Sequence, residues 1–124
     1  MPLHWTIDSK ERLVTAIAEG AVTRGEVEDY IAAMNGAGTL SYRKFFDCSR
    51  GDTAMTPEDM LAIGVQLRAR HANTATLGPL AIVVSSAKSE LVSRVLGILA
   101  AANRPMRVFS ETEPARRWID SLPK

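Results

Sequence analysis

The chain has 124 residues, of which 46% are hydrophobic and 23% are charged, and its formal net charge is +1 at pH 7. These values are typical of one soluble globular domain, and they exclude a collagen-like or largely disordered chain. The near-zero charge argues against a nucleic-acid partner, because such a partner requires an excess of Lys and Arg. We therefore predict a single domain over residues 1–124.

Residues that would imply a metal or an oxidising compartment are scarce. The single cysteine, Cys48, cannot form an internal disulfide or a multi-thiolate zinc site. His4 and His71 lie far apart and have no clustered acidic partners. The N-terminus lacks the pattern of a signal peptide, and the longest mostly apolar run, 91–102, is too short to span a bilayer. We expect a cytoplasmic protein with no transmembrane segment, metal or cofactor.

The first forty residues predict two strands and a helix. Apolar and polar residues alternate over 3–8, as in a strand with one buried face, and a polar turn leads to a second strand over 12–19. Strands joined by so short a connection pair antiparallel. Thr23 and Glu26 then have the spacing of a capping box, ahead of a helical apolar stripe that the glycine-rich segment 35–38 ends.

The middle of the chain predicts a strand and a well-marked helix start. A strand over 41–48 leads through a polar loop to a helix over 57–71. Thr56 has the side-chain oxygen of a helix N-cap, and the carboxylates of Glu58 and Asp59 oppose the positive end of the helix dipole. These residues specify where the helix begins.

The second half continues the alternation of strands and helices. Leu80–Val84 is a continuous apolar run, which suits a central strand covered on both faces. A largely apolar helix follows, then a short strand over 106–109, and Ser110 with Glu113 has the spacing of a capping box before a last helix. The predicted order is β-β-α-β-α-β-α-β-α. It corresponds to an α/β domain with a mixed sheet, in which an N-terminal antiparallel strand pair precedes parallel strands.

Three motifs in this order resemble the SpoIIAA-like family of the STAS superfamily. They are the strand end Phe45-Phe46-Asp47-Cys48-Ser49, the strand Ala81-Ile82-Val83-Val84, and the strand Met106-Arg107-Val108-Phe109 with the following helix that contains Trp118-Ile119. Together they span nearly the whole chain. The resemblance implies a bacterial regulatory domain that binds a protein partner and has no catalytic residues.

The resemblance also bears on phosphorylation. In the phosphorylated anti-sigma-factor antagonists of this superfamily, the second helix opens with Asp-Ser-Ser-Gly, and the second serine accepts the phosphate. The matching stretch here is Met55-Thr56-Pro57-Glu58, so Pro57 stands at the acceptor position and has no hydroxyl. We therefore expect no serine switch. Thr56, the neighbouring hydroxyl, is interpreted as a structural N-cap, with its modification as the alternative.

Asp47, at the end of a predicted strand, also has two interpretations. An acidic residue there is typical of the phospho-acceptor of a response-regulator receiver. A receiver needs in addition an acidic pair after its first strand and a lysine after its last strand. Only Asp8 and the segment 110–112, which lacks lysine, stand at those places. We expect Asp47 instead to accept backbone N–H groups in the loop that follows it.

The predicted recognition face consists of the loop 49–55 and the start of the next helix, because loops at the strand ends of such sheets carry function. Its candidate residues are Asp47, Ser49, Thr56, Glu58 and Asp59. The expected occupant is a protein partner. The alternative, from a different class, is a carrier of a small apolar or lipid-like ligand, as in the Sec14-type domains with which SpoIIAA-like proteins are compared. A homodimer is a further open possibility.

Overall fold

The structure is a computed structural model and describes residues 3–39, 41–53, 56, 58–59, 61–63, 65, 78–85 and 106–124. The elements in chain order are β1 (Leu3–Asp8), β2 (Leu13–Val22), α1 (Arg24–Gly36), β3 (Arg43–Thr53), β4 (Leu80–Val83), β5 (Met106–Phe109) and α4 (Thr112–Ser121). Further helical residues are 58–59, 61–63 and 65, where the sequence predicted a helix. The predicted apolar helix between β4 and β5 lies outside the described residues.

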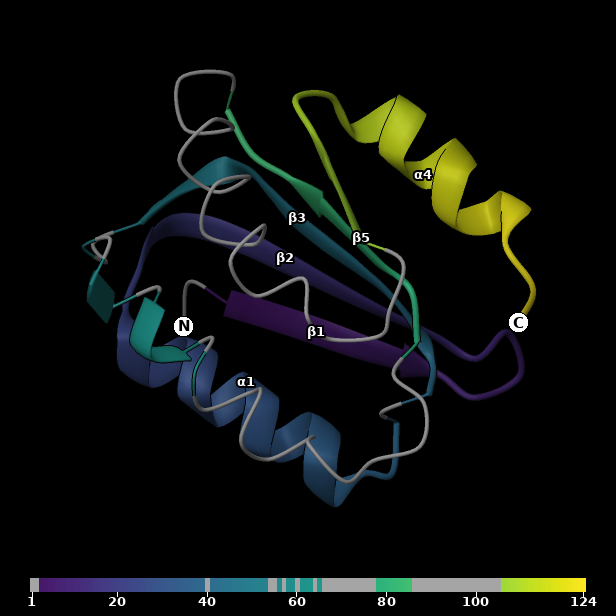
Figure 1. The fold of residues 1–124 in the computed structure, drawn as a ribbon, viewed down its shortest axis with the longest axis horizontal. Coiled ribbons are helices and arrows are strands. Elements are labelled where there is room, and N and C mark those ends of the chain that lie inside the picture. The colour runs from purple at the N-terminus through teal and green to yellow at the C-terminus, as the bar shows by residue number, and fades with distance from the viewer. Residues whose placement is uncertain are drawn as a thin grey trace.

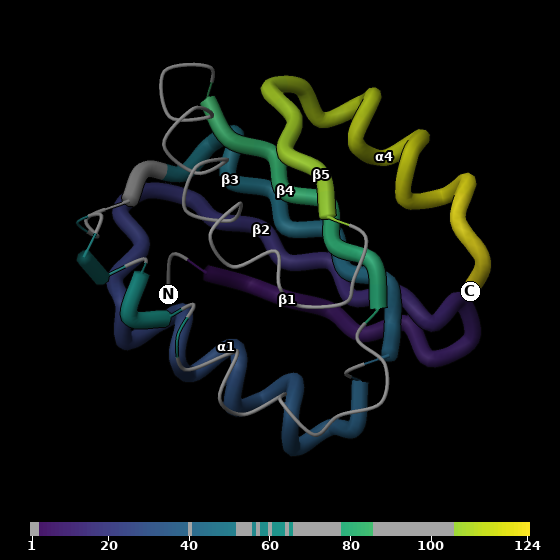
Figure 2. The backbone as a smooth tube through the Cα atoms, viewed as in Figure 1, coloured from purple at the N-terminus to yellow at the C-terminus, as the bar shows by residue number. Residues whose placement is uncertain are grey.

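The strands form one five-stranded sheet with the order β1-β2-β3-β4-β5. Figure 2 shows the strands side by side in this order. β1 pairs antiparallel with β2, whereas β3, β4 and β5 each run parallel to the strand before them. The predicted α/β class, with a mixed sheet that begins with an antiparallel pair, is confirmed.

One face of the sheet packs against α1. Thr23 and Glu26 form the predicted capping box at the start of this helix, and the helix then buries Tyr30 and Met34. The Tyr30 ring makes an edge contact with the ring of Trp5 at a centroid distance of 5.5 Å. The buried core on this side consists of Leu3, Val14, Ala16, Ala18, Val22, Tyr30 and Met34. Alternate residues of β1 and β2 supply it, as the period of a strand requires.

The opposite face packs against α4, and Figure 1 shows α1 and α4 on opposite sides of the sheet. The core on this side consists of Leu13, Phe45, Ala81, Val83, Ala115 and Ile119. Ala115 and Ile119 are four positions apart, so they lie on the same face of α4. Both are fully buried. The two helices thus give the sheet two separate apolar cores.

The predicted end of the third strand was wrong. β3 does not end at Cys48 but runs on to Thr53, so residues 49–53 of the predicted recognition loop belong to a strand. The cause is tertiary, because Arg50–Thr53 pairs in parallel with Glu19–Val22 of β2. Ladder pairing with a neighbouring strand overrides the turn preference of a polar, glycine-containing sequence.

The predicted capping box at Ser110 was also wrong. α4 begins at Thr112, its N-cap is Glu111, and no side-chain hydrogen bond caps it. The N-cap therefore lies one residue later than the spacing of Ser110 and Glu113 predicted.

Candidate functional site

A β-bulge interrupts β3 at the predicted recognition residues. β2 and β3 are in register up to Asp47 and again from Arg50, and between these points Cys48 and Ser49 stand opposite Ala18 alone. An extra residue of this kind bends its strand, leaves backbone groups unpaired and changes the direction of side chains, and bulges are frequent beside functional sites. Ser49, in the bulge, and Arg50, directly after it, are exposed to solvent.

Asp47 stabilises the bulge. Its Oδ1 atom accepts the backbone N–H of Ser49 at 2.9 Å, which satisfies a donor in the segment where the ladder is irregular. Its Oδ2 atom accepts the hydroxyl of Thr112 at 3.4 Å. The prediction that Asp47 accepts a backbone N–H is confirmed, although the N–H belongs to a bulged strand and not to a loop. Asp47 also links β3 to the first residue of α4.

Cys48, the other bulged residue, is half-buried and packs against the core beneath α1. Burial, assisted by the negative charge of Asp47, raises the pKa of the Cys48 thiol from 9.0 to about 12. The thiolate is the nucleophilic form of cysteine. At neutral pH Cys48 therefore remains protonated and fills apolar space.

Thr56 is the N-cap of the next helix, as predicted. Its Oγ1 accepts the backbone N–H of Asp59 at 3.1 Å, and Asp59 Oδ2 accepts the backbone N–H of Thr56 at 3.1 Å. This reciprocal pair has the arrangement of a capping box, with Asp in place of the usual Glu or Gln. Asp59 Oδ1 also lies 3.6 Å from Nη1 of Arg24 at the start of α1. The Thr56 backbone hydrogen bond, with smaller contributions from the Thr56 hydroxyl and Arg24, lowers the pKa of Asp59.

Four of the five predicted residues form two groups. Asp47 and Ser49 lie at the bulge, where Asp47 contacts α4, whereas Thr56 and Asp59 cap the next helix, where Asp59 contacts α1. Between these described residues, no hydrogen bond or ion pair joins one group to the other. Glu58, beside Thr56, is exposed to solvent.

Arg43 is a further residue of interest, and sequence reasoning missed it. Its side chain is only 5% exposed, although it carries a permanent charge. Nη1 donates to the carbonyl oxygen of Ile119 at 3.0 Å, and Nη2 donates to that of Glu11 at 2.8 Å. The alternation of strand residues could have predicted its burial, because Arg43 shares a face of β3 with the buried Phe45.

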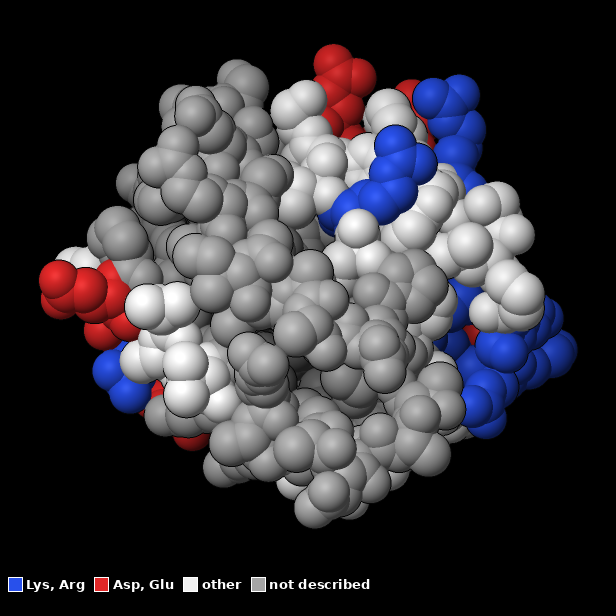
Figure 3. All heavy atoms as spheres, viewed as in Figure 1, with Lys and Arg blue, Asp and Glu red and all other residues white. Residues whose placement is uncertain are grey.

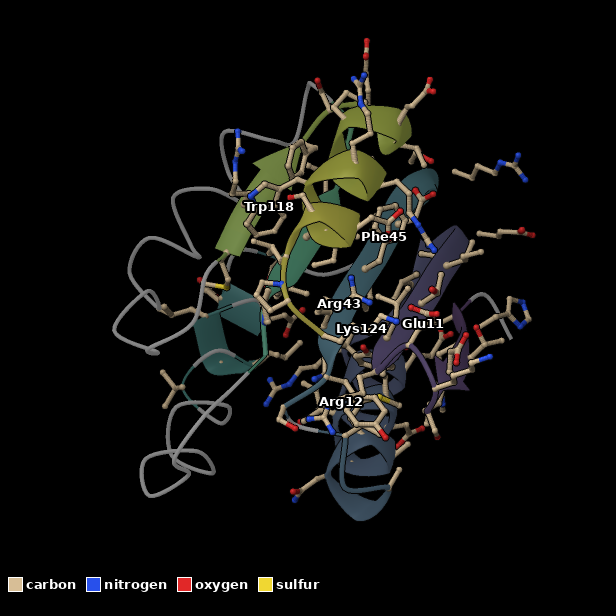
Figure 4. All side chains as sticks on the ribbon, turned by 90° about the vertical axis from the view of Figure 1, so that its right-hand side faces the viewer. Glu11, Arg12, Arg43, Phe45, Trp118 and Lys124 are labelled. Carbon is tan, nitrogen blue, oxygen red and sulfur yellow. The ribbon has the colours of Figure 1, made fainter. Side chains whose placement is uncertain are left out.

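A pocket of about 340 Å³ adjoins Arg43. Figure 3 shows Lys and Arg side chains gathered at this end of the molecule, where Figure 1 places the C-terminus. The pocket is lined by Glu11, Leu13, Arg43, Arg116, Asp120, Leu122 and Lys124. Opposite charges pair within this lining: Lys124 Nζ lies 2.9 Å from Glu11 Oε2, and Arg116 Nε lies 3.3 Å from Asp120 Oδ2. Figure 4 shows Arg43, Lys124 and Glu11 converging there. A lining of this kind does not suit the apolar ligand of the carrier interpretation.

The described residues contain no group of three or more His, Cys, Asp or Glu side chains that could hold a metal ion. His71 lies outside them, whereas His4 is an exposed residue of β1. None of the described helices is long and apolar enough to cross a lipid bilayer.

Comparison with known proteins identifies the fold. No protein-family model matches the sequence, and no curated protein matches it significantly. The structure is similar to the crystal structure of an uncharacterized protein of the DUF3478 family, with a SpoIIAA-like fold, from Shewanella loihica PV-4. The match covers 94% of this chain and 91% of the other, with a TM-score of 0.57 and 15% sequence identity. The predicted SpoIIAA-like fold is confirmed.

Proposed function

Given a SpoIIAA-like fold, we propose that this chain is a non-enzymatic regulatory domain that binds a protein partner around the β3 bulge and the start of the next helix. The observation that carries the proposal is the bulge held by Asp47. A bulged strand segment that is already ordered loses little conformational entropy when a partner binds, and Ser49 and Arg50 are exposed there.

The proposed domain works without a phosphorylation switch. The Thr56 hydroxyl is engaged by the backbone N–H of Asp59. A phosphate at Thr56 would bring two negative charges beside the carboxylates of Glu58 and Asp59, and like charges at such short range repel. Pro57, at the usual acceptor position, has no hydroxyl to modify. Partner binding would therefore depend on the concentration of the partner and not on modification of this helix start.

The proposal is tested by affinity capture from a lysate of the source organism, followed by quantitative mass spectrometry. Ser49→Arg introduces a long charged side chain at the exposed bulge. Ser121→Arg is the matched control, because Ser121 is also an exposed serine, at the last residue of α4, near the pocket end of the molecule.

We expect the wild-type protein and Ser121→Arg to capture the same partner, and Ser49→Arg to lose it. Direct titration of the purified partner should then show that Ser49→Arg weakens binding at least tenfold. Equal capture by all three proteins would exclude the bulge as the recognition face.

A further inference from the structure

β1 is an edge strand of the sheet as the described residues form it. It pairs with β2 on one side, and Figure 4 shows it at the right-hand edge with no further strand beyond it. The outer edge of such a strand presents backbone N–H and C=O groups that a strand of another chain can pair with. Proteins commonly block such edges with Lys, Pro or a bulge. The sequence of β1, Leu-His-Trp-Thr-Ile-Asp, contains neither Lys nor Pro.

The side chains of β1 remain accessible at this edge. Ile7 is 38% exposed, and Trp5, on the same face, is only half-buried despite its contact with Tyr30. His4, Thr6 and Asp8 are exposed. Apolar side chains lie on one face of β1 and polar side chains on the other, which is the alternation of a strand with one buried face.

The order of these residues is self-complementary. In an antiparallel pair centred on Thr6, His4 stands opposite Asp8 of the second copy, Trp5 opposite Ile7, and Thr6 opposite Thr6. Each is a favourable cross-strand pair: an imidazole with a carboxylate, an aromatic ring with a β-branched side chain, and two threonines. The two-fold axis generates the His4–Asp8 pair and the Trp5–Ile7 pair twice, because each copy contributes both members of each pair to an isologous interface.

Other registers lack this match. A shift that pairs odd with even positions would place the apolar face of one copy against the polar face of the other, so strand alternation excludes it. Centring the pair on Trp5 would oppose His4 to Thr6 and leave Asp8 without a basic partner. In the register centred on Thr6, Asp8 can also pair with His4 of the second copy. Its Oδ1 atom accepts the backbone N–H of Glu11 at 3.0 Å, and its Oδ2 atom remains available.

We propose that β1 is the interface between two copies of this chain, which pair antiparallel about Thr6 into one continuous sheet that joins the five described strands of each copy. The dimer covers the exposed parts of Trp5 and Ile7. The dimer interface is separate from the β3 bulge. A substitution in β1 should therefore weaken dimerisation alone, and a substitution at the bulge should weaken partner binding alone.

The first test uses two substitutions at His4 in the full chain, with the dimer dissociation constant measured by sedimentation equilibrium. His4→Lys keeps a group that can pair with the Asp8 carboxylate. His4→Asp sets two like-charged pairs across the interface. We expect His4→Lys to dimerise at least as well as the wild type and His4→Asp to weaken dimerisation tenfold or more. Because His4 is exposed, both variants should retain the wild-type circular dichroism spectrum, which shows that they still fold.

The second test examines the register of the two β1 strands by disulfide cross-linking. In Thr6→Cys, the two new thiols lie at directly opposed positions, where Cα atoms about 4.5–5.5 Å apart allow a disulfide. Thr15→Cys is the matched control, since Thr15 pairs with Thr6 on β2 and its copies would be about 14 Å apart across the interface, three strand spacings. Mild oxidation should give a covalent dimer of Thr6→Cys and not of Thr15→Cys.

Three results would overturn the proposal. They are a wild-type chain that sediments as a monomer up to its solubility limit, equal effects of the two His4 substitutions, and a Thr6→Cys variant that cross-links no better than Thr15→Cys. Each is independent of the capture experiment at Ser49.

Discussion

Arg43 donates a hydrogen bond from Nη1 to the carbonyl oxygen of Ile119 at 3.0 Å, and this bond joins the first residue of β3 to the last turn of α4. The same guanidinium reaches the Glu11 carbonyl in the turn between β1 and β2. One buried side chain therefore ties together three parts of the chain that are distant in sequence. Its Nε atom is buried without a hydrogen-bond partner, so the arrangement is not fully optimised.

Removal of the Arg43 side chain should destabilise the folded protein. We expect Arg43→Ala to lower the free energy of unfolding by about 3 kcal/mol, because one buried and one partly buried carbonyl group lose their donor and a cavity remains. Arg43→Met should cost less, since it keeps the volume and no longer buries a charge. Urea denaturation measures both values. Arg117→Ala, at an exposed position of α4, is the control and should change stability by less than about 0.5 kcal/mol. An Arg43→Ala variant as stable as this control would contradict the prediction.

The Thr56 cap should contribute measurably to stability. Thr56→Ala removes the oxygen that accepts the Asp59 N–H and should lower the free energy of unfolding by about 1 kcal/mol. Thr56→Ser retains the hydroxyl and should stay close to the wild type. Thermal melting followed by circular dichroism distinguishes the two variants, and equal losses in both would show that the hydroxyl is not the stabilising group.

The same cap should make stability depend on pH. The pKa of Asp59 is lowered from its ordinary value of 3.8, so the folded state favours the ionised carboxylate. The resulting stabilisation is present above the unfolded pKa and is lost as the pH falls through the lower folded pKa. We expect the wild type to exceed Asp59→Asn in stability at neutral pH, and the difference to shrink below about pH 4. A difference that is constant from neutral to acidic pH would exclude an electrostatic origin.

Gly51 should be required for the extension of β3. A Cβ atom on Gly51 would lie 2.8 Å from Cβ of Ala18 and 3.1 Å from its carbonyl oxygen. Gly51→Ala should therefore destabilise the protein by about 1–3 kcal/mol, and the double variant with Ala18→Gly should recover part of this loss. Gly36→Ala, in α1, has nothing within 4 Å of the added Cβ and serves as the control, with little or no loss of stability. Chemical denaturation of the four proteins provides the comparison.

Cys48 should react slowly in the folded protein. With a pKa of about 12, almost none of the thiol is ionised at pH 8, and only the thiolate attacks an alkylating reagent. Labelling by iodoacetamide, followed by intact-mass spectrometry, should be at least a hundredfold slower in buffer than in concentrated urea. Rapid labelling of the folded chain would show that Cys48 is ionised and accessible.

Several features of the candidate site could be predicted from the sequence because they depend on residues close together in the chain. The caps at Thr23 and Thr56 use partners three residues away. The hydrogen bond from the Ser49 backbone to Asp47 spans two residues. Local hydrogen bonds of this type require a particular side chain at a particular spacing, and both are visible in the sequence.

The sequence by itself determined the order of the five described strands, the positions of α1 and α4, the antiparallel pair at the start and the caps at Thr23 and Thr56, because period and spacing act over a few residues. Only the tertiary structure decided that β3 continues to Thr53 with a bulge after Asp47, that β1 forms an edge of the sheet, and that Arg43 is buried. These features depend on partners from elsewhere in the chain, such as β2 for the bulge and Ile119, 76 residues away, for Arg43. Strand pairing and side-chain burial are properties of the assembled layers, and a local pattern contains no information about which distant segment will be the neighbour.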